Sequence, residues 1–268
     1  MKMIPNRLKT RIVDIAAESH IGTVRKTNQD RFFLRAFADG TVFTAIVDGL
    51  GGVPAGDIAA DLVVQALSRL DALCAGEEER LLANLAIRLD RVVEAAREGD
   101  PLMGGMGTTL ILVWIKNGRA FWVHVGDSRL YLLRNRRLHQ ITRDQTLARF
   151  LLAEGEITPD QAKAHYSRQV MNQHLGCGYC EPETDGFTLT EGDLLLLSTD
   201  GLHQSVPKGQ LERLLNGHTS TEDTVRALVK AALDAGGRDN ITGVIVKMKS
   251  PAHPATHSGR QGLDDKKR

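Results

Sequence analysis

Residues 109–133 read TLILVWIKNGRAFWVHVGDSRLYLL, and this stretch decides the fold class. Two apolar runs, 109–116 and 119–125, are separated by Asn117-Gly118, a pair that favours the tight turn of a β-hairpin. A third short run, 130–133, follows. The pattern predicts an antiparallel meander.

The elements around this meander are grouped by type. An alternating stretch at 11–17 and short strands at 31–34 and 42–47 come first, and two helices lie between them and the meander. Strands that alternated with helices would predict a doubly wound parallel sheet, whereas grouped strands favour antiparallel pairing. We therefore expect an α+β domain of layered antiparallel sheets with outer helices.

Both predicted helices carry an apolar stripe at helical spacing against a charged back. The stripe of the first helix consists of Ile58, Leu62, Ala66, Leu70 and Leu73. The stripe of the second consists of Leu81, Leu85, Leu89, Val92 and Ala96. Such stripes predict helices that lie on a sheet.

Residues 142–185 form a polar segment of different character. It contains a helical stretch at 145–154, and Thr158 can cap a short helix that begins at Pro159. We expect it to be an insertion on the surface of a single domain that spans residues 1–249. Residues 250–268 carry few large apolar side chains, so we expect a disordered tail.

The composition excludes several kinds of partner. The chain has 34 basic and 33 acidic residues, a balance that creates no field to attract nucleic acid or an anionic membrane. It contains no apolar run of about 18 residues, the minimum for a membrane helix, and its start lacks the apolar core of a secretory signal. Three cysteines do not make a disulfide framework. We expect a cytoplasmic protein.

Four aspartates stand at the ends of strongly apolar runs, three of them beside a glycine. They are Asp48, Asp127, Asp200 and Asp239. Carboxylates that meet at strand ends repel one another unless a cation lies between them. Oxygen ligands suit hard ions, so the pattern predicts Mg²⁺ or Mn²⁺ rather than Zn²⁺.

Each aspartate also has a simpler explanation. An Asp-Gly pair after a strand is by itself a turn signal, Asp127 could pair with Arg129, and Asp239 could cap a turn. Cys177 and Cys180 have the spacing of a zinc or redox motif, but no second ligand pair follows, so we interpret them as two incidental thiols.

Six short motifs, taken in order, are similar to those of one enzyme family. They are RKTNQD at 25–30, VDGLGG at 47–52, GTT at 107–109, VGDSR at 125–129, STDG at 198–201 and DNIT at 239–242. Together they resemble the bacterial branch of the metal-dependent Ser/Thr protein phosphatases of the PP2C type, or PPM family. The resemblance covers residues 11–248. It implies a four-layer α-β-β-α sandwich with a metal site at one edge of two central antiparallel sheets, and it makes the insertion a flap over that site.

The resemblance also implies a ligand set. It places Asp48 between two Mn²⁺ or Mg²⁺ ions, with Asp200 and Asp239 on one ion and the Gly49 carbonyl on the other. Asp127 would help to hold a third, weaker ion. Two such ions can activate a water molecule and clamp the phosphoryl oxygens for in-line displacement.

Asp48, Arg25 and Asp30 are the catalytic residues that the resemblance implies. Arg25 would bind the phosphate, because a planar guanidinium can grip two oxygens at once, although a solvated loop charge is its default explanation. Asp30 would orient metal-bound water from behind the ligands. Leu50 departs from many animal relatives, which have histidine there. Leucine cannot donate a proton to the leaving alkoxide, so either metal-bound water does so or that step is slow.

The implied function is hydrolysis of phosphoserine and phosphothreonine in proteins. The chain would act as a monomer and oppose a bacterial Ser/Thr kinase. The alternative is a pseudophosphatase that binds a phosphoprotein or kinase without turnover, and the presence of all four metal aspartates argues against it.

Overall fold

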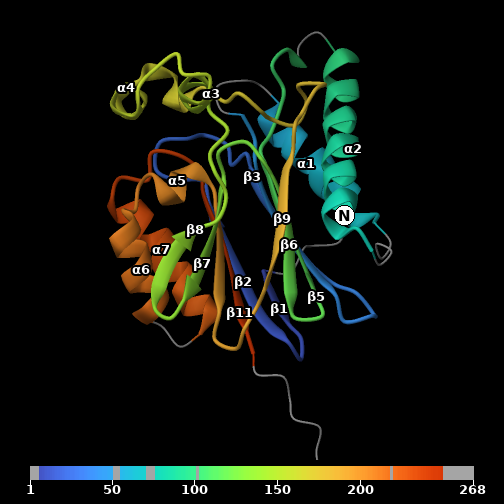
Figure 1. Ribbon diagram of the computed structural model, residues 1–268, viewed down its shortest axis with the longest axis vertical. Coiled ribbons are helices and arrows are strands. Elements are labelled where there is room, and N and C mark those ends of the chain that lie inside the picture. Colours follow the sequence, from blue (N-terminus) through green and yellow to red (C-terminus); the bar gives the residue numbers. More distant parts are fainter. Residues whose placement is uncertain (1–5, 51–54, 71–75, 101–102, 218–219, 250–268) are drawn as a thin grey trace, which may run out of the picture.

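The computed structural model describes residues 6–50, 55–70, 76–100, 103–217 and 220–249, which form two packed sheets covered by helices (Figure 1). Within these residues every strand pair is antiparallel. The six-stranded sheet has the order β1-β2-β11-β10-β7-β8 and the five-stranded sheet the order β3-β4-β5-β6-β9. The predicted tail, residues 250–268, lies outside the described residues.

The strands of the six-stranded sheet are β1 (Arg7–Lys9), β2 (Val13–His20), β7 (Arg129–Arg134), β8 (Arg137–Gln140), β10 (Leu194–Ser198) and β11 (Ile241–Met248). The strands of the five-stranded sheet are β3 (Asp30–Ala36), β4 (Val42–Asp48), β5 (Leu110–Lys116), β6 (Arg119–Val125) and β9 (Glu183–Thr188). Asn117 and Gly118 join β5 to β6 with positive φ angles of 49° and 72°, so the predicted hairpin is confirmed.

Strand β4 shows why the central strands are apolar on both faces. Successive side chains of a strand point to opposite sides of the sheet. Phe43 and Val47 pack into the core beneath one helical layer, whereas Val42 and Ile46 pack into the core between the two sheets. A third core joins the six-stranded sheet to the opposite helices. Three cores between four layers confirm the predicted α-β-β-α sandwich.

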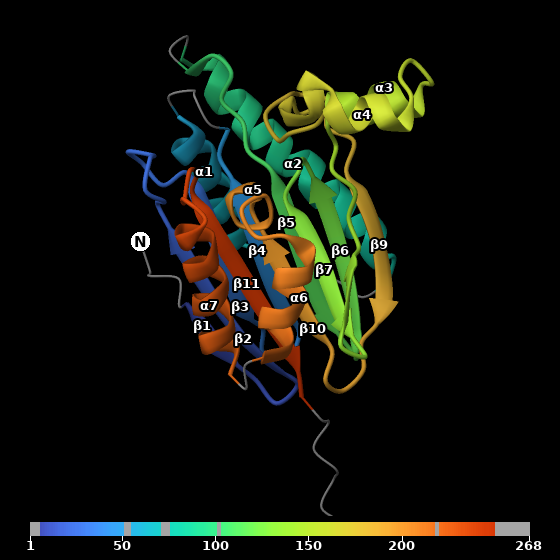
Figure 2. The ribbon, with the colours of Figure 1, turned by 90° about the vertical axis from the view of Figure 1, so that its left-hand side faces the viewer.

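The helical layers lie on opposite sides of the sandwich (Figures 1 and 2). One consists of α1 (Gly56–Ser68) and α2 (Glu78–Glu98). The other consists of α5 (Asp200–His203), α6 (Lys208–Gly217) and α7 (Thr221–Asp234).

The predicted stripe of the first helix is partly right. Leu62, Ala66 and Leu70 are partly buried against the core. Helix α1 buries a neighbouring set more deeply, namely Ala59, Ala60, Val63, Val64 and Leu67. Ile58 is 41% exposed, the helix ends at Ser68, and Leu73 lies outside the described residues. Both sides of this helix are apolar, and the small alanines on one side allow close approach to the sheet.

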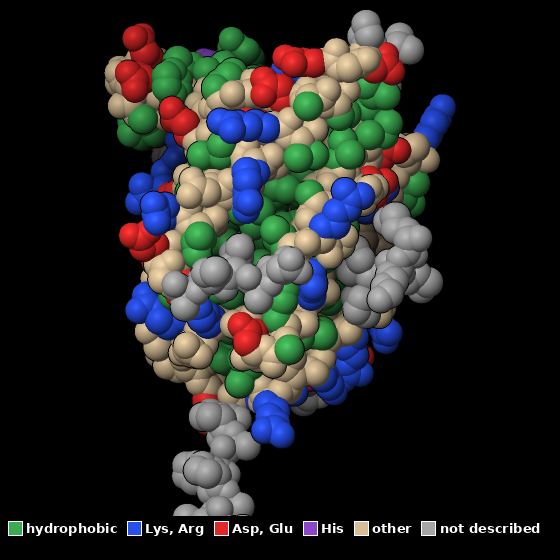
Figure 3. Space-filling model, turned by 90° about the vertical axis from the view of Figure 1, so that its right-hand side faces the viewer, with side chains coloured by type: hydrophobic (Ala, Val, Ile, Leu, Met, Phe, Trp, Pro, Cys, Tyr) green, Lys and Arg blue, Asp and Glu red, His purple; other side chains and the backbone are tan. Residues whose placement is uncertain are grey.

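The stripe of the second helix is only partly right. Leu85 and Leu89 are buried, but Val92 is 40% exposed. Figure 3 looks onto this side of the molecule and shows hydrophobic side chains that reach the surface among charged ones.

The segment between β8 and β9 lies above the edge of the sandwich (Figure 1). It carries α3 (Leu147–Ala153), α4 (Pro159–Ala164) and a 3₁₀ helix, η2 (Tyr166–Gln169). The predicted cap is confirmed, because the Thr158 hydroxyl accepts the Gln161 N–H and the Gln161 side chain accepts the Thr158 N–H. Over the described ranges, no helix is both long and apolar enough to cross a bilayer.

Candidate metal centre

Five aspartates lie at strand ends on one edge of the sandwich. Asp48 ends β4, and Asp30, which begins β3, lies directly opposite it in register. Asp127 follows β6, Asp200 opens α5 directly after β10, and Asp239 precedes β11. Like charges opposite each other in a sheet are destabilising, so this edge needs a compensating charge.

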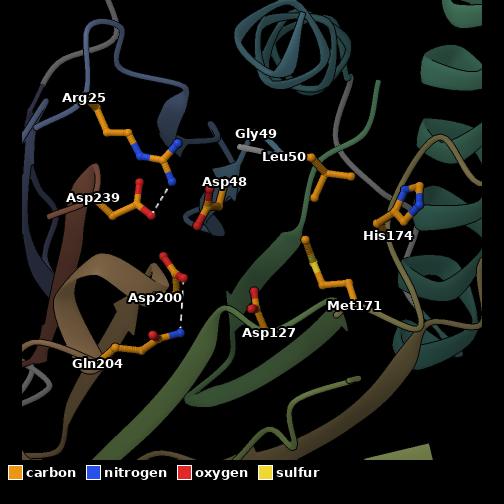
Figure 4. Close-up of a pocket in the computed structure, with 10 residues that line it drawn as sticks. All are labelled: Arg25, Asp48, Gly49, Leu50, Asp127, Met171, His174, Asp200, Gln204 and Asp239. Carbon is orange, nitrogen blue, oxygen red and sulfur yellow. Dashed lines mark hydrogen bonds and ion pairs between the residues drawn. The ribbon is translucent and has the colours of Figure 1, made fainter. Parts of the chain in front are cut away.

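Four of these aspartates share one cavity of about 480 Å³. Figure 4 shows Asp48, Asp127, Asp200 and Asp239 directed toward the same space. The other lining residues are Arg25, Gly49, Leu50, Met171, His174 and Gln204. The structure therefore brings together every residue that the sequence proposed for metal or phosphate, and it leaves Asp30 behind Asp48, outside the lining.

Asn240 fixes the loop that carries Arg25. Its side-chain N–H groups donate to the carbonyls of Ile21, at 2.9 Å, and Thr27, at 3.0 Å. Its side-chain oxygen accepts the Gln29 N–H at 2.8 Å. The sequence analysis placed Asn240 in the DNIT motif at 239–242 but gave it no role of its own, so it missed this positioning role.

Gly201 allows α5 to approach the loop before β11. A Cβ at this position would collide with the Asn240 carbonyl oxygen, and it would lie 3.2 Å from the Asp239 Cβ. Any other residue would push the first turn of α5 away, and Asp200 would separate from Asp239.

Burial and mutual repulsion raise the pKa values of three of these carboxylates. Burial, followed by repulsion from Asp30, Asp200, Asp127 and Asp239, raises the pKa of Asp48 well above its ordinary value. Burial also raises the pKa of Asp127 to about 7, and burial with repulsion from Asp239 raises that of Asp200 to about 6. A divalent cation between the carboxylates would oppose these shifts, because it stabilises their charged forms.

Asp30 is buried beside Asp48 with its hydrogen bonding incomplete. Its Oδ2 accepts the Thr199 hydroxyl at 2.9 Å, while its Oδ1 is a buried atom without a hydrogen-bond partner. Burial raises the pKa of this carboxyl to about 7. A free acceptor at this place is what an orienting group for metal-bound water requires.

Two side chains donate hydrogen bonds to the cavity aspartates. Arg25 Nη2 donates to Asp239 Oδ2 at 2.7 Å, and Gln204 Nε2 donates to Asp200 Oδ2 at 3.1 Å (Figure 4). Sequence reasoning missed Gln204, although its position four residues after Asp200 is a usable signal on a helical turn.

The donor set fits open coordination rather than a closed cage. In the described part of the chain, no three His, Cys, Asp or Glu side chains form a group ready to hold one ion. Mg²⁺-like ions keep several waters and take one or two carboxylates, which suits oxygen donors spread around a cavity. The ligand set of Asp48, Asp200 and Asp239 for one ion stays a prediction.

The insertion is tied to the turn that carries Asp127. The Gly126 N–H donates to the Gln145 side-chain oxygen, and the Gln145 N–H donates to the Gly126 carbonyl, both at 2.8 Å. Arg129 binds Asp144 through Nε at 2.8 Å and Nη2 at 2.7 Å. Arg129 thus holds the insertion in place through Asp144. It does not pair with Asp127, which was the simpler explanation for that aspartate.

Cys177 and Cys180 are free thiols. Burial raises the pKa of Cys177 and raises that of Cys180 to about 12. Thiols of this kind are poor nucleophiles and poor metal ligands, in line with their interpretation as incidental.

Comparison with known proteins connects this edge with phosphatases. The family model for protein phosphatase 2C matches residues 18–238. The serine/threonine protein phosphatase PstP of Mycobacterium tuberculosis is 36% identical over 237 residues, which cover 88% of this chain and 45% of PstP. The chain thus spans about half the length of that relative. The protein phosphatase PhpP of Streptococcus pneumoniae is 31% identical over 244 residues, 88% of this chain and 98% of PhpP.

Solved structures of bacterial serine/threonine phosphatases superpose on this chain. The catalytic domain of PstP in complex with two manganese ions superposes with a TM-score of 0.77 at 33% identity, over 89% of this chain and 99% of that domain. The Streptococcus agalactiae serine/threonine phosphatase gives a TM-score of 0.82 at 28% identity, over 88% of this chain and all of the other.

Proposed function

The chain belongs to the protein phosphatase 2C family, and from this premise we propose that it hydrolyses phosphoserine and phosphothreonine in proteins with the help of Mn²⁺ or Mg²⁺. One observation carries the proposal. Four partly buried carboxylates converge on one cavity, and the Arg25 side chain lines it as well. Such a cluster is stable and ionised only with added positive charge.

Two ions would be held by Asp48, the Gly49 carbonyl, Asp200 and Asp239, and a third by Asp127. When bound, such ions supply an activated water and charge to stabilise the phosphoryl group. The choice between Mn²⁺ and Mg²⁺ and the third ion are part of the proposal.

Arg25 binds the phosphate of the substrate. Its guanidinium faces the cavity and donates to Asp239, and its remaining N–H groups are available for two phosphoryl oxygens. Asn240 keeps the Arg25 loop in place, so the phosphate is held at a fixed position relative to Asp48.

Asp30 orients the attacking water from behind Asp48. Its free Oδ1 is the acceptor for this purpose, and Thr199 fixes the other oxygen at 2.9 Å. Because the carboxyl is buried and held, it can accept a hydrogen bond in one direction only, which lowers the cost of reaching the reactive geometry.

The physiological partners in this proposal are a Ser/Thr kinase and its phosphorylated substrates. The cytoplasmic location and the monomeric state expected from the sequence stay predictions.

The test is hydrolysis of p-nitrophenyl phosphate and of a phosphothreonine peptide with Mn²⁺, with Mg²⁺ and with EDTA. We expect activity with either ion and none in EDTA. Asp200→Asn should lower kcat about a thousandfold, since several kcal/mol of charge stabilisation are lost. Asp234→Asn is the matched control, because Asp234 lies on the exposed side of α7 and pairs with Lys230.

A wild-type chain that is inactive with every ion would contradict the proposal. The pseudophosphatase would then be the better account, and it predicts phosphopeptide binding without turnover.

A further inference from the structure

The cavity has a second end that the proposed chemistry does not use. Figure 4 shows Leu50, Met171 and His174 on the side opposite Arg25 and Asp239. None of the three is an acid, and Leu50 and Met171 are apolar. Met171 and His174 come from the insertion, whereas Leu50 follows the predicted ligand Gly49.

Backbone pairing fixes the segment that carries Met171 and His174 at both of its ends. Before Met171, the Leu147 N–H donates to the Val170 carbonyl at 2.8 Å, and Met171 forms a β-bridge with Thr146. After His174, Leu175 and Thr108 exchange hydrogen bonds of 2.8 and 3.1 Å. A segment fixed in this way presents its side chains with little further loss of entropy when a ligand binds.

Gly107 leaves room for the side chains of both Leu50 and His174. A Cβ on Gly107 would lie 2.6 Å from His174 Nδ1 and 2.8 Å from Leu50 Cδ1, so both side chains rest on this glycine. His174 Nδ1 lies 3.1 Å from the Leu175 carbonyl, which can only accept. Nδ1 therefore carries the hydrogen, and in the neutral ring Nε2 is left as an acceptor.

A protein substrate has to lie across the end of the cavity that is formed by Leu50, Met171 and His174. Its phosphorylated side chain must reach the aspartates and Arg25, while the backbone and the neighbouring residues remain outside that end. In an extended peptide successive side chains point to opposite sides, so the next side chain on the same side belongs to the residue two positions along, roughly 6.6 Å away. That side chain therefore comes to the other end of the same cavity.

Building on the proposed function, we propose that Leu50, Met171 and His174 form a subsite for an uncharged, apolar side chain two residues from the phosphorylated residue. Leu50 and Met171 supply the apolar contact, and His174 Nε2 accepts a peptide N–H. A lysine or glutamate there would lose water against Leu50 and Met171 without gaining a partner.

The test compares phosphothreonine peptides that differ at one position only, with leucine, glycine or lysine placed two residues before the phosphorylated residue and, in a second set, two residues after it. With the Mn²⁺-loaded full chain, we expect kcat/KM to be about tenfold higher for leucine in one of the two sets, the range that one apolar contact gives in a hydrophobic pocket.

Met171→Ala should reduce that preference, measured as the ratio of kcat/KM for the leucine and glycine peptides, to less than about twofold. Val170→Ala is the matched control, because Val170 is adjacent, 44% exposed and outside the cavity lining. Met171→Gln keeps the side-chain length and should lose the preference too, which covers a folding defect of the alanine variant. His174→Ala should slow all peptides alike.

Equal kcat/KM for the three peptides, or a leucine preference that survives in both Met171 variants, would overturn the subsite. A wild-type chain inactive on every substrate would instead contradict the proposed function. Fluorescence anisotropy with the same peptides would then decide the subsite, which predicts tighter binding of the leucine peptide and loss of that difference in Met171→Ala.

Discussion

Asp193 and Asp30 are equally buried, at 2% exposure each, but their surroundings are opposite. Asp193 accepts hydrogen bonds from Arg134 at 2.9 and 2.6 Å and from the Thr190 N–H at 2.7 Å. Although burial alone would raise its pKa, these donors leave the pKa of Asp193 below its ordinary value. Asp30 has one hydroxyl donor and faces Asp48, and burial raises its pKa to about 7.

Asp90 repeats the first arrangement. This buried carboxylate on α2 accepts the N–H groups of Gly176 at 2.6 Å and Gly178 at 3.2 Å, and so anchors the chain after His174. The difference between Asp193 and Asp90, on the one hand, and Asp30, on the other, shows that buried aspartates are of two kinds. Those that the chain supplies with donors hold the structure together, and those without donors depend on a cation from outside.

The largest expected effect separates activity from stability at the cavity. Asp48→Asn should lower kcat about a thousandfold, because several kcal/mol of stabilisation depend on the site. In EDTA the same variant should be more stable than the wild type, since asparagine removes a carboxyl whose pKa is raised in the folded state by burial and by repulsion from Asp30, Asp200 and Asp127. Phosphatase assays and urea unfolding in EDTA measure the two effects. A variant that is less stable in EDTA would break the comparison.

Asp193→Asn should show the opposite pattern. It removes the charged acceptor of Arg134, and the free energy of unfolding should fall by about 2 kcal/mol. Because Asp193 lies away from the cavity lining, kcat per folded molecule should stay unchanged. Urea unfolding is the measurement, and Asp234→Asn on the surface should change stability by less than about 0.5 kcal/mol. If Asp48→Asn and Asp193→Asn changed activity and stability in the same way, the distinction between the two kinds of buried aspartate would be lost.

Arg25 donates a hydrogen bond to the cavity residue Asp239. Replacing it with lysine tests whether the planar guanidinium, and not only the charge, is needed. Arg25→Lys keeps the charge but loses the planar pair of N–H groups, so inhibition by inorganic phosphate should weaken about tenfold. Lys26→Ala, on the same loop but outside the cavity lining, is the control. If Arg25→Lys binds phosphate as the wild type does, Arg25 is not the phosphate ligand.

The pH dependence of stability gives the smallest effect. In the folded chain without metal, Asp30 and Asp127 keep their protons up to about pH 7, whereas unfolding returns their pKa values to about 4. The folded state thus binds more protons, so stability should fall as pH rises from about 6.5 to about 7.5, by about 0.7 kcal/mol per group, because each group loses its proton in the folded state around pH 7.

His203 defines the lower limit of that window. Burial lowers its pKa to about 3, so its contribution to stability is lost as pH falls below about 6.5 and would mask the carboxylates there. Thermal unfolding in EDTA at the two pH values measures the slope. Saturating Mn²⁺ should abolish it and Asp30→Asn should reduce it, whereas a slope that rises with pH in EDTA would contradict the assigned pKa directions.

Local signals in the sequence predicted most of the strands and the cavity aspartates. Asp48 directly follows an apolar run, Asp200 follows another after Ser198 and Thr199, and Asn117-Gly118 defines its own hairpin, so neighbouring residues were enough. The buried face of helix α1 was predicted only in part because both of its sides are apolar, and packing of Ala59 and Ala60 against the sheet decided between them.

The remaining cavity residues depended on tertiary contacts. Met171 and His174 face the aspartates because of pairing with Thr146 and, through Leu175, with Thr108, and neither pairing leaves a trace in the local sequence.

The most direct test of the central claim counts the metal ions. Metal-free protein is titrated with Mn²⁺, and the free ion is followed by electron paramagnetic resonance in the wild type, Asp48→Asn and Asp193→Asn. We expect at least two ions per wild-type chain, the same number in Asp193→Asn, and loss of at least one in Asp48→Asn. A wild-type chain that binds no Mn²⁺, or an Asp48→Asn variant that binds as many ions as the wild type, would contradict the account.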